Sequence, residues 1–327
     1  MPIISIILPA FNAAGSIGPC LDSILAQTMP DLEVVCVNDG STDDTESCLE
    51  RYTRDDPRVR CLSFRQNSKS VIARKRGVLD AAGDFIMFAD ADDLLMPDAC
   101  EKLLALMEET PADVLQFAIQ LETEKTDGVN PTFEGFFAAH DLSLTAPDIL
   151  SYCFILHRFS HNLWNKICRA DPCRKAFADM PDCSLPYYND MYALFFVLYH
   201  ASTFRSVSTE PLYLYRFRGI GSYADPTPRQ FEDLCAAMKM FPLIERFLSG
   251  QNDLDRHRYV LDAMKDDIYR DALTKLLTVS DLDPELIRTA CRAFGPDILF
   301  DFLRKIGLMQ VQVSSRQGLI QRLTKNM

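Results

Sequence analysis

The sequence predicts an α/β protein with a mostly parallel sheet flanked by helices and a C-terminal helical extension. Three observations support this fold class: short apolar runs recur along the first 122 residues, amphipathic stretches separate them, and the pattern beyond Asp225 is helical almost to the end. Strands that alternate with helices along a chain form parallel sheets with right-handed crossovers. With 327 residues and a hydrophobic content of 48%, the chain can bury a large core.

The predicted strands are rich in β-branched and aromatic residues and almost free of polar ones, as strands covered on both faces are. They lie at residues 3–8, 32–37, 59–64, 85–89 and 113–119. Ligands of such sheets bind at the carboxyl ends of the strands. The polar residues found there are Asn12 after the first strand, Asn38 and Asp39 after the second, and Asp90 and Asp92 after the fourth.

Helical spacing and capping residues predict the helices between these strands. The first helix carries apolar residues at the spacing of one helix face, which are Ile17, Leu21, Ile24 and Leu25. Ser41 and Asp44 predict a capping box at the start of the next helix. Pro97 is predicted to open a later helix, with Leu103, Leu104 and Met107 on its inner face.

A further helix is predicted around residues 71–82. Its apolar arc holds Val71, Ile72, Val78, Leu79 and Ala82, and Lys75 falls within the same arc, flanked by Arg74 and Arg76. A cation on a buried arc needs a partner. We therefore expect Lys75 to point toward the strand-end site and to pair with Asp39 or Asp90.

The stretch FIMFADADDLLMP combines a buried strand with a cluster of carboxylates. Asp90, Asp92 and Asp93 follow one another closely, and carboxylates at this spacing repel unless a cation or full solvent compensates them. Residues 58–76 hold seven Lys or Arg and no acid, whereas residues 84–101 hold six Asp or Glu and no base. Two interpretations follow: a phosphate and a cation bound in one site, or solvated faces of opposite sign.

The alternation of strands and helices stops near residue 123. TEKTDGVNPTFEG has the composition of a loop, and the residues after it are richer in aromatics. From residue 225 onward the pattern is helical. The sequence therefore predicts three segments, at residues 1–122, 123–224 and 225–327.

The composition excludes several classes of protein. A net charge of −12 argues against nucleic-acid binding, because a protein that follows a phosphate backbone needs a basic face. The 11 cysteines form no C-x-x-C motif, so reduced thiols in a cytosolic protein are expected rather than a disulfide framework or a zinc site. No Lys or Arg precedes Arg51, which argues against a signal peptide. No apolar run reaches the ~18 residues of a membrane helix.

The basic C-terminal segment has two interpretations. Residues 288–327 carry seven Lys or Arg against two Asp, and they include the amphipathic stretch DILFDFLRKIGL. The segment either contacts an acidic membrane surface or packs as an ordinary terminal helical layer. The expected location is the cytoplasm, with or without peripheral attachment at the inner face of the cell membrane.

Short stretches spread over roughly residues 3–222 form an ordered series. They are SIILPAFNA at 5–13, VNDGSTDDT at 37–45, ARKRG at 73–77, GDFIMFADADD at 83–93, WNK at 164–166, ND at 189–190 and YLYRFRGIGS at 213–222. Together they resemble the family 2 glycosyltransferases, in particular the bacterial enzymes that build cell-surface polysaccharides. A lone D-x-D motif arises by chance, but the ordered series is specific.

This resemblance implies the GT-A fold, in which a Rossmann-like nucleotide half is joined to an acceptor half. Residues 1–122 would then bind a nucleotide sugar, residues 123–224 would bind the acceptor, and residues 225–327 would form the helical extension. The family transfers a sugar from a nucleotide diphosphate with inversion. That in-line displacement needs a cation for the departing diphosphate and a base for the acceptor hydroxyl.

The resemblance also implies individual site residues. The D-x-D motif matches Asp90, Ala91 and Asp92, where Asp92 is the better ligand for Mn²⁺ or Mg²⁺ and Asp90 lies nearer the ribose or a metal-bound water. Oxygen ligands suit these cations, whose coordination the substrate phosphates complete. The other implied nucleotide-binding residues are Pro9, Ala10, Phe11 and Asn12, then Asp39, which would accept the N3 hydrogen of uracil, and Arg74.

Asp190 matches the catalytic base of the family, although the family usually has Glu where this chain has Asn189. Asn189 and Asp190 are also suited to cap the helix that follows them. Both roles can coexist, since a helix N-terminus favours an ionised carboxylate. Asp39 is alternatively a turn or helix-cap residue, and residues 9–12 are alternatively an ordinary turn at a strand end.

The expected function is inverting, metal-dependent transfer of a sugar from a UDP-sugar to a glycan or lipid-linked acceptor in cell-surface polysaccharide synthesis. Trp164 is the only tryptophan, so the Q-x-x-R-W signature of processive synthases is absent and non-processive transfer is expected. His157 and His161 are further candidates on the acceptor side. The alternative is a catalytically inactive, glycosyltransferase-like binding or scaffold protein, against which the intact acidic residues argue.

Overall fold

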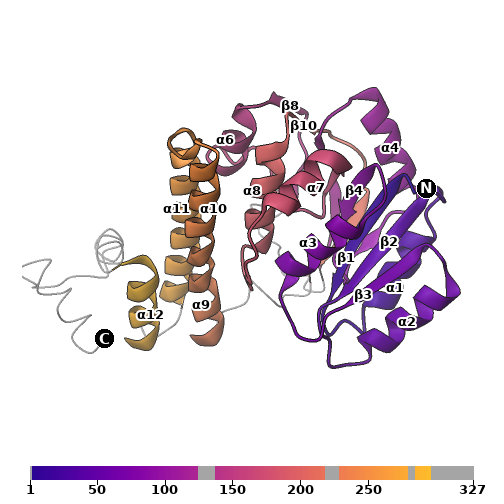
Figure 1. The fold of residues 1–327 in the computed structure, drawn as a ribbon, viewed down its shortest axis with the longest axis horizontal. Coiled ribbons are helices and arrows are strands. Elements are labelled where there is room, and N and C mark those ends of the chain that lie inside the picture. Colours follow the sequence, from indigo (N-terminus) through magenta and orange to yellow (C-terminus); the bar gives the residue numbers. More distant parts are fainter. Residues whose placement is uncertain (1, 124–136, 218–227, 279–283, 296–327) are drawn as a thin grey trace, which may run out of the picture. The chain divides into compact units, whose positions relative to one another are not determined.

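A computed structural model describes residues 2–123, 137–217, 228–278 and 284–295 (Figure 1). The chain divides into two compact units, one of residues 1–184 and 189–219 and the other of residues 185–188 and 220–327. The first unit contains both sheets, and the regular elements described in the second are helices. The functional halves expected at residues 1–122 and 123–224 stay predictions.

An eight-stranded sheet lies at the centre of the first unit, in the order β3-β2-β1-β4-β9-β6-β10-β8. Its strands are β1 (Ile4–Ala10), β2 (Leu32–Asn38), β3 (Val59–Ser63), β4 (Phe85–Phe88), β6 (Val114–Gln116), β8 (Leu142–Thr145), β9 (Lys166–Arg169) and β10 (Thr203–Ser206). β1 is parallel to β2 and β4, β2 to β3, and β6 to β10, whereas β8 and β9 run antiparallel to their neighbours. The predicted mostly parallel sheet is confirmed.

Helices cover both faces of this sheet, which explains why β1 is apolar at almost every position. Ile4, Ile6 and Leu8 belong to a core cluster with residues of α1 (Ile17–Leu25) and α4 (Ala99–Glu109). On the other face, α3 (Ser70–Asp80) packs on β1 and β2 so closely that a Cβ at Gly77 would lie 2.6 Å from Ile7 Cγ2. The described part of this unit also contains α2 (Thr45–Asp55), α6 (Asp148–Phe154), α7 (Ala170–Asp179) and α8 (Asn189–His200).

A second, three-stranded sheet joins distant segments of the first unit. β5 (Leu94–Leu95), directly after the D-x-D motif, pairs with β11 (Tyr213–Phe217), which is parallel to β7 (Ile119–Thr123). The single strand predicted at 113–119 is therefore wrong, because β6 and β7 belong to different sheets. The apolar pattern does not mark this break, since Phe117 between the two strands is also fully buried.

The starts of two helices differ from the prediction. α2 begins at Thr45, and its N-cap Asp44 makes no side-chain cap hydrogen bond. Ser41 lies in the preceding loop, where its Oγ accepts a hydrogen bond from the amide of Asn12 (3.0 Å). The predicted capping box is wrong because this hydroxyl serves a neighbouring loop instead of the helix. α4 begins at Ala99 rather than at Pro97.

The second unit is helical in its described part, which confirms the predicted C-terminal helical region. Its elements are α9 (Pro228–Cys235), the 3₁₀ helix η1 (Ala236–Lys239), α10 (Met240–Gly250), α11 (Leu254–Thr278) and α12 (Pro284–Phe294). α11 packs against α9, α10 and α12. None of the helices that the structure describes has both the length and the apolar character needed to cross a membrane. The stretch DILFDFLRKIGL lies outside the described residues, so its membrane contact stays a prediction.

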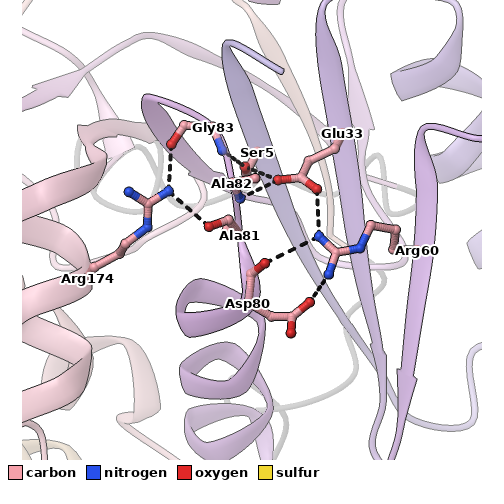
Figure 2. A network of polar contacts seen from close by, with 8 residues as sticks. All are labelled: Ser5, Glu33, Arg60, Asp80, Ala81, Ala82, Gly83 and Arg174. Carbon is pink, nitrogen blue, oxygen red and sulfur yellow. Dashed lines mark hydrogen bonds and ion pairs between the residues drawn. The ribbon is translucent and has the colours of Figure 1, made fainter. Parts of the chain in front are cut away.

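A polar network fixes the turn between α3 and β4 (Figure 2). It joins Ser5, Glu33, Arg60, Asp80, Arg174 and the turn residues Ala81, Ala82 and Gly83. Glu33 Oε1 accepts hydrogen bonds from Ser5 Oγ and from the amide of Ala82, both at 2.6 Å, and Glu33 Oε2 accepts one from Arg60 (2.9 Å). Arg60 also pairs with Asp80 at the end of α3. The end of the helix that carries Arg74 is thus held to the sheet.

Candidate active site

A pocket of about 400 Å³ lies at the carboxyl ends of β1, β2 and β4. It is lined by Pro9, Ala10, Phe11, Asn12, Ala13, Ser16, Asp39, Ser70, Arg74, Asp90, Ala91 and Asp92. Every residue predicted to bind the nucleotide or the metal belongs to this set. Ala13, Ser16 and Ser70 were not predicted, because small residues outside a motif give no signal in a single sequence.

The loops after β1 and β2 hold each other in place beside the pocket. Asn12 has a left-handed backbone (φ 50°), and its Oδ1 accepts hydrogen bonds from the amide (2.8 Å) and hydroxyl (3.3 Å) of Thr42. Gly40 also has a positive φ of 70°, and a Cβ there would lie 2.6 Å from the backbone carbon of Gln66. This close approach requires glycine. Pro9 and Ala10 are therefore the end of β1, Phe11 and Asn12 form the turn that follows it, and all four line the pocket.

Asp39 is almost fully buried, with 3% of its surface exposed. Its Oδ1 accepts a hydrogen bond from the amide of Ser68 (2.7 Å), and its Oδ2 accepts one from the amide of Lys69 (2.8 Å), directly before α3. Burial raises the pKa of Asp39, and the two amide hydrogen bonds oppose this shift. Asp39 thus holds the start of a helix, as the alternative interpretation expects. Each carboxylate oxygen retains another acceptor position for a ligand.

The three aspartates after β4 have different surroundings. Asp92 is exposed at the pocket, and no described group donates a hydrogen bond to its carboxylate. Asp93 is buried and accepts hydrogen bonds from the hydroxyl of Tyr213 and the amide of Arg216, both at 2.8 Å. Burial raises the pKa of Asp93 to about 8. The acidic cluster is tolerated in part because Asp93 has its own donors, which the sequence did not indicate.

Arg74 connects the D-x-D motif to Asp190. Its side chain is buried, with Nη2 at 2.8 Å from Asp90 Oδ1 and Nη1 at 2.7 Å from both Asp190 Oδ1 and Asn189 Oδ1. Burial lowers the pKa of Arg74, but Asp190 and Asp90 outweigh it, and the net shift is upward. Burial raises the pKa of Asp90 to about 6, although Arg74 opposes the shift. A permanent cation therefore lies between two carboxylates of the site.

The prediction for Lys75 is wrong. Its Nζ donates hydrogen bonds to the carbonyl of Met180 (2.6 Å) and to Asp182 Oδ1 (2.8 Å), not to a strand-end carboxylate. One residue along a helix corresponds to a rotation of ~100°, so Lys75 and Arg74 cannot both face the pocket. The residue expected beside Lys75, Arg74, makes the strand-end contact instead.

Asp190 lies in the first turn of α8, outside the residues that line the pocket. Its Oδ1 accepts a hydrogen bond from Arg74, and its Oδ2 accepts one from the amide of Leu163 (3.2 Å). The carboxylate therefore belongs to the same polar cluster as Asp90. Nearby, burial lowers the pKa of His161 to about 4 against the opposing effect of Asp190. The roles of His157 and His161 on the acceptor side stay predictions.

Asp90 and Asp92 are the residues of the pocket that could bind a divalent cation. Within the ranges that the structure describes, no three His, Cys, Asp or Glu side chains are grouped so that they could hold a metal by themselves. Asp92 offers an unengaged carboxylate, and Asp90 retains Oδ2 while its Oδ1 binds Arg74. Two such oxygen donors fit a cation whose other ligands are a diphosphate and water.

A mostly parallel sheet with a D-x-D motif in a pocket at its carboxyl edge is the arrangement of GT-A glycosyltransferases. Residues 5–164 match the family described as glycosyl transferase family 2, and this part of the chain belongs to that family.

Two bacterial relatives illustrate the match. The chain is 33% identical over 171 residues to YibD of Escherichia coli (strain K12), an uncharacterised glycosyltransferase, in an alignment that covers 51% of this chain and 48% of that protein. It is 28% identical over 268 residues to EpsH of Bacillus subtilis (strain 168), which is assigned as a glycosyltransferase. This second alignment covers 80% of the chain and 73% of EpsH. The match to YibD thus spans about half the length of that relative.

Solved structures share the fold. TarS of S. aureus (residues 1–349) in complex with UDP-GlcNAc superposes with a TM-score of 0.64 at 20% identity, covering 90% of this chain and 82% of that chain. The mannosyltransferase PcManGT from Pyrobaculum calidifontis, in complex with GDP-Man and Mn²⁺, gives a TM-score of 0.52 at 14% identity, with 99% and 84% covered. These similarities confirm the predicted fold class.

Proposed function

We propose that the protein transfers a single sugar from a UDP-sugar to a hydroxyl group of a glycan or lipid-linked acceptor in polysaccharide synthesis, with inversion and with a divalent cation. One observation carries this proposal: the pocket is lined by Asp39, Asp90, Asp92 and Arg74, and the guanidinium of Arg74 also binds Asp190. A single side chain therefore links the donor pocket to the candidate base.

The pocket chemistry supports a uridine nucleotide as the donor. Asp39 lines the pocket and has acceptor positions left for the N3 hydrogen of uracil. Phe11, which is 45% exposed, offers an aromatic face for the base. TarS, whose fold this chain shares, binds UDP-GlcNAc, and we propose the same nucleotide here.

A Mn²⁺ or Mg²⁺ ion is proposed to bind together with the donor, at Asp92 and beside Asp90. When bound, the cation neutralises the charge that develops on the departing diphosphate. The complex of PcManGT with Mn²⁺ supports a metal in this fold. Asp92 would hold the cation and Arg74 would keep Asp90 in place.

Asp190 is proposed to act as the base. In one in-line step its carboxylate accepts the proton of the acceptor hydroxyl, the acceptor oxygen bonds to the anomeric carbon, and the bond from that carbon to the diphosphate breaks. Both oxygens of Asp190 already accept a hydrogen bond, and each has a further lone pair for the incoming proton. Attack opposite the leaving diphosphate inverts the anomeric centre.

Calorimetric titration with UDP tests the donor and metal sites together. We expect UDP to bind on the order of tenfold more tightly, or better, with Mn²⁺ than with EDTA, and Asp92→Ala to remove this difference. Equal affinity under both conditions would contradict the metal site. A panel of UDP-sugars is then assayed for transfer and for slow hydrolysis. Tight binding of a UDP-sugar that is never turned over would favour the inactive binding protein.

A further inference from the structure

Lys166 is a buried cation that lies outside the donor pocket. It is the first residue of β9, in the interior of the large sheet, and 0% of its surface is exposed. Among the described residues no carboxylate forms an ion pair with it, and it does not line the pocket. A buried ammonium is tolerated only when its donors are satisfied. Its partners therefore indicate what it does.

The ammonium of Lys166 is surrounded by oxygen atoms of the loop that precedes it. Nζ donates hydrogen bonds to the carbonyls of Ser160 (2.8 Å) and Asn162 (2.6 Å) and to Asn165 Oδ1 (2.8 Å). An ammonium has three donors, so each of them is used. Burial lowers the pKa of Lys166 to about 7, against the opposing electrostatic effects of Cys153, Cys168 and Asp190. Residues 160–165 are folded around this one group.

The same loop supplies a donor to Asp190. The amide of Leu163 donates to Asp190 Oδ2 at 3.2 Å, while Arg74 donates to Oδ1 at 2.7 Å. Two donors on different oxygens fix the rotation of the carboxylate and therefore the direction of its remaining lone pairs. Leu163 is fully buried, so water cannot reach its amide and take its place as the donor to Asp190.

A second anchor keeps the far end of the loop in place. The ring of Trp164 stacks on Tyr213 at 5.3 Å and on Tyr215 at 4.8 Å between ring centroids. The carbonyl of Asn165 accepts a hydrogen bond from the amide of Phe117 (3.1 Å). Removal of the ammonium is therefore expected to loosen residues 160–163 without unfolding the sheet.

We propose that Lys166 is a positioning residue for sugar transfer: its ammonium closes loop 160–165 and so places the Leu163 amide that orients the carboxylate of Asp190. This inference rests on the proposed role of Asp190 as the base. It gives the lysine of the WNK stretch a role that requires no contact with either substrate.

Lys166→Met tests the inference, since methionine keeps an unbranched stem and removes the ammonium. Lys102→Met is the matched control, because Lys102 pairs with Asp98 and Glu210 on the surface. Rates are expressed per UDP-binding site, counted by calorimetry with Mn²⁺. We expect Lys166→Met to lower kcat by about 10- to 100-fold, as misplacement of a catalytic group does, with UDP affinity and acceptor KM unchanged. The control should match the wild type. A wild-type kcat in Lys166→Met would overturn the inference.

A double-mutant cycle with Asp190→Asn separates positioning from a general structural defect. If Lys166 acts through Asp190, Lys166→Met costs nothing further in the Asp190→Asn protein. A further loss of the same size would overturn the inference. By contrast, wild-type transfer by Asp190→Asn itself would overturn the proposed role of Asp190 as the base, on which this inference rests.

The Leu163 amide can also be tested directly, which keeps the question open to experiment if Lys166→Met does not fold. Replacing Leu163 by its α-hydroxy acid converts the amide to an ester, which removes the N–H donor to Asp190 and also weakens the Asn162 carbonyl as an acceptor for Lys166. We expect the same loss in kcat, of about 10- to 100-fold, with UDP affinity retained. An unchanged kcat would contradict the positioning role of the loop.

Discussion

Arg74 and Asp190 are in direct contact, with Nη1 of the guanidinium 2.7 Å from Oδ1 of the carboxylate. Nη2 of the same guanidinium lies 2.8 Å from Asp90 Oδ1. Asp90 and Asp190 are far apart in the sequence, and a shared cation offsets the repulsion between them. Arg74 therefore fixes the distance between the D-x-D motif and the proposed base.

Arg74→Met should destabilise the protein, because it leaves Asp90 and Asp190 facing each other without a cation. Removing one partner of a buried ion pair costs about 3–5 kcal/mol. The two carboxylate side chains retain 31% and 16% exposure, so we expect the lower end, about 3 kcal/mol in the free energy of urea unfolding. Arg54→Met is the control, since Arg54 and Asp55 form an exposed pair worth about 0–1 kcal/mol. Equal losses in the two variants would contradict the role of Arg74.

Asp190→Asn should abolish most of the transfer and spare donor binding. A positioned base contributes on the order of 10²- to 10⁴-fold to rate, and Asp190 does not line the pocket. Asp39→Asn should instead weaken binding of the UDP-sugar itself. Calorimetry with Mn²⁺ and a transfer assay with chemistry rate-limiting distinguish the two. If Asp190→Asn transferred sugar at the wild-type rate, Asp190 would not be the base, and its carboxylate would only hold Arg74 and the Leu163 amide.

Gly40→Ala should destabilise the loops beside the pocket. The backbone of Gly40 is left-handed, and the added Cβ would lie 2.6 Å from the carbon of Gln66. Strain and steric overlap of this kind cost about 2–4 kcal/mol together, and UDP affinity should fall as the loops shift. Gly15→Ala is the matched control in the same region, because no atom lies within 4 Å of its added Cβ. Thermal unfolding of both variants measures the difference, and similar melting temperatures would refute it.

Glu33→Gln should make stability less sensitive to acid. Burial raises the pKa of Glu33, but hydrogen bonds from Ser5, Ala82 and Arg60 outweigh it and hold the pKa below its ordinary value of 4.5 (Figure 2). The unfolded chain therefore binds this proton more readily. Glu33 stabilises the fold above about pH 4.5 and loses this contribution as the pH falls further.

Urea unfolding at several pH values measures this effect. We expect Glu33→Gln to lower the free energy of unfolding by about 1–3 kcal/mol at pH 7. Below pH 4.5, the free energy of unfolding of this variant should fall less steeply than that of the wild type. Glu50→Gln, on the exposed surface of α2, serves as the control. An acid decline that is identical in the wild type and Glu33→Gln would show that Glu33 is not its source.

The sequence predicted the first four strands well because burial on both faces leaves a local mark, whereas β5 and β8 to β11 were not predicted. β1 and β2 are apolar along most of their length, and the pocket residues follow directly after them. The apolar pattern of a helix gives a less exact signal. In α3 it correctly predicted a basic residue near the pocket, but it indicated Lys75 instead of its neighbour Arg74. Adjacent residues of a helix differ by a rotation of only ~100°, which the pattern did not resolve.

Contacts between distant segments were not predictable from a single sequence. Nothing near Asp93 indicates that Tyr213 and Arg216 supply its donors. The WNK stretch was noted as a match, but the burial of Lys166 against three oxygen atoms depends on how its loop folds back. These features are set by tertiary structure, whereas the pattern of apolar residues reports local burial alone.

Because the small sheet pairs β5 with β11, parts of the site that lie together are synthesised at very different times. Every residue that lines the pocket has been synthesised once Asp92 has been added to the chain. The hydroxyl of Tyr213, however, arrives 120 residues after Asp93, and the amide of Arg216 arrives later still. A nascent chain that ends before Tyr213 contains all the residues that line the donor pocket, but its Asp93 lacks both of these hydrogen-bond donors. The acidic segment at the pocket is therefore synthesised early, but the donors that stabilise its buried Asp93 are synthesised late.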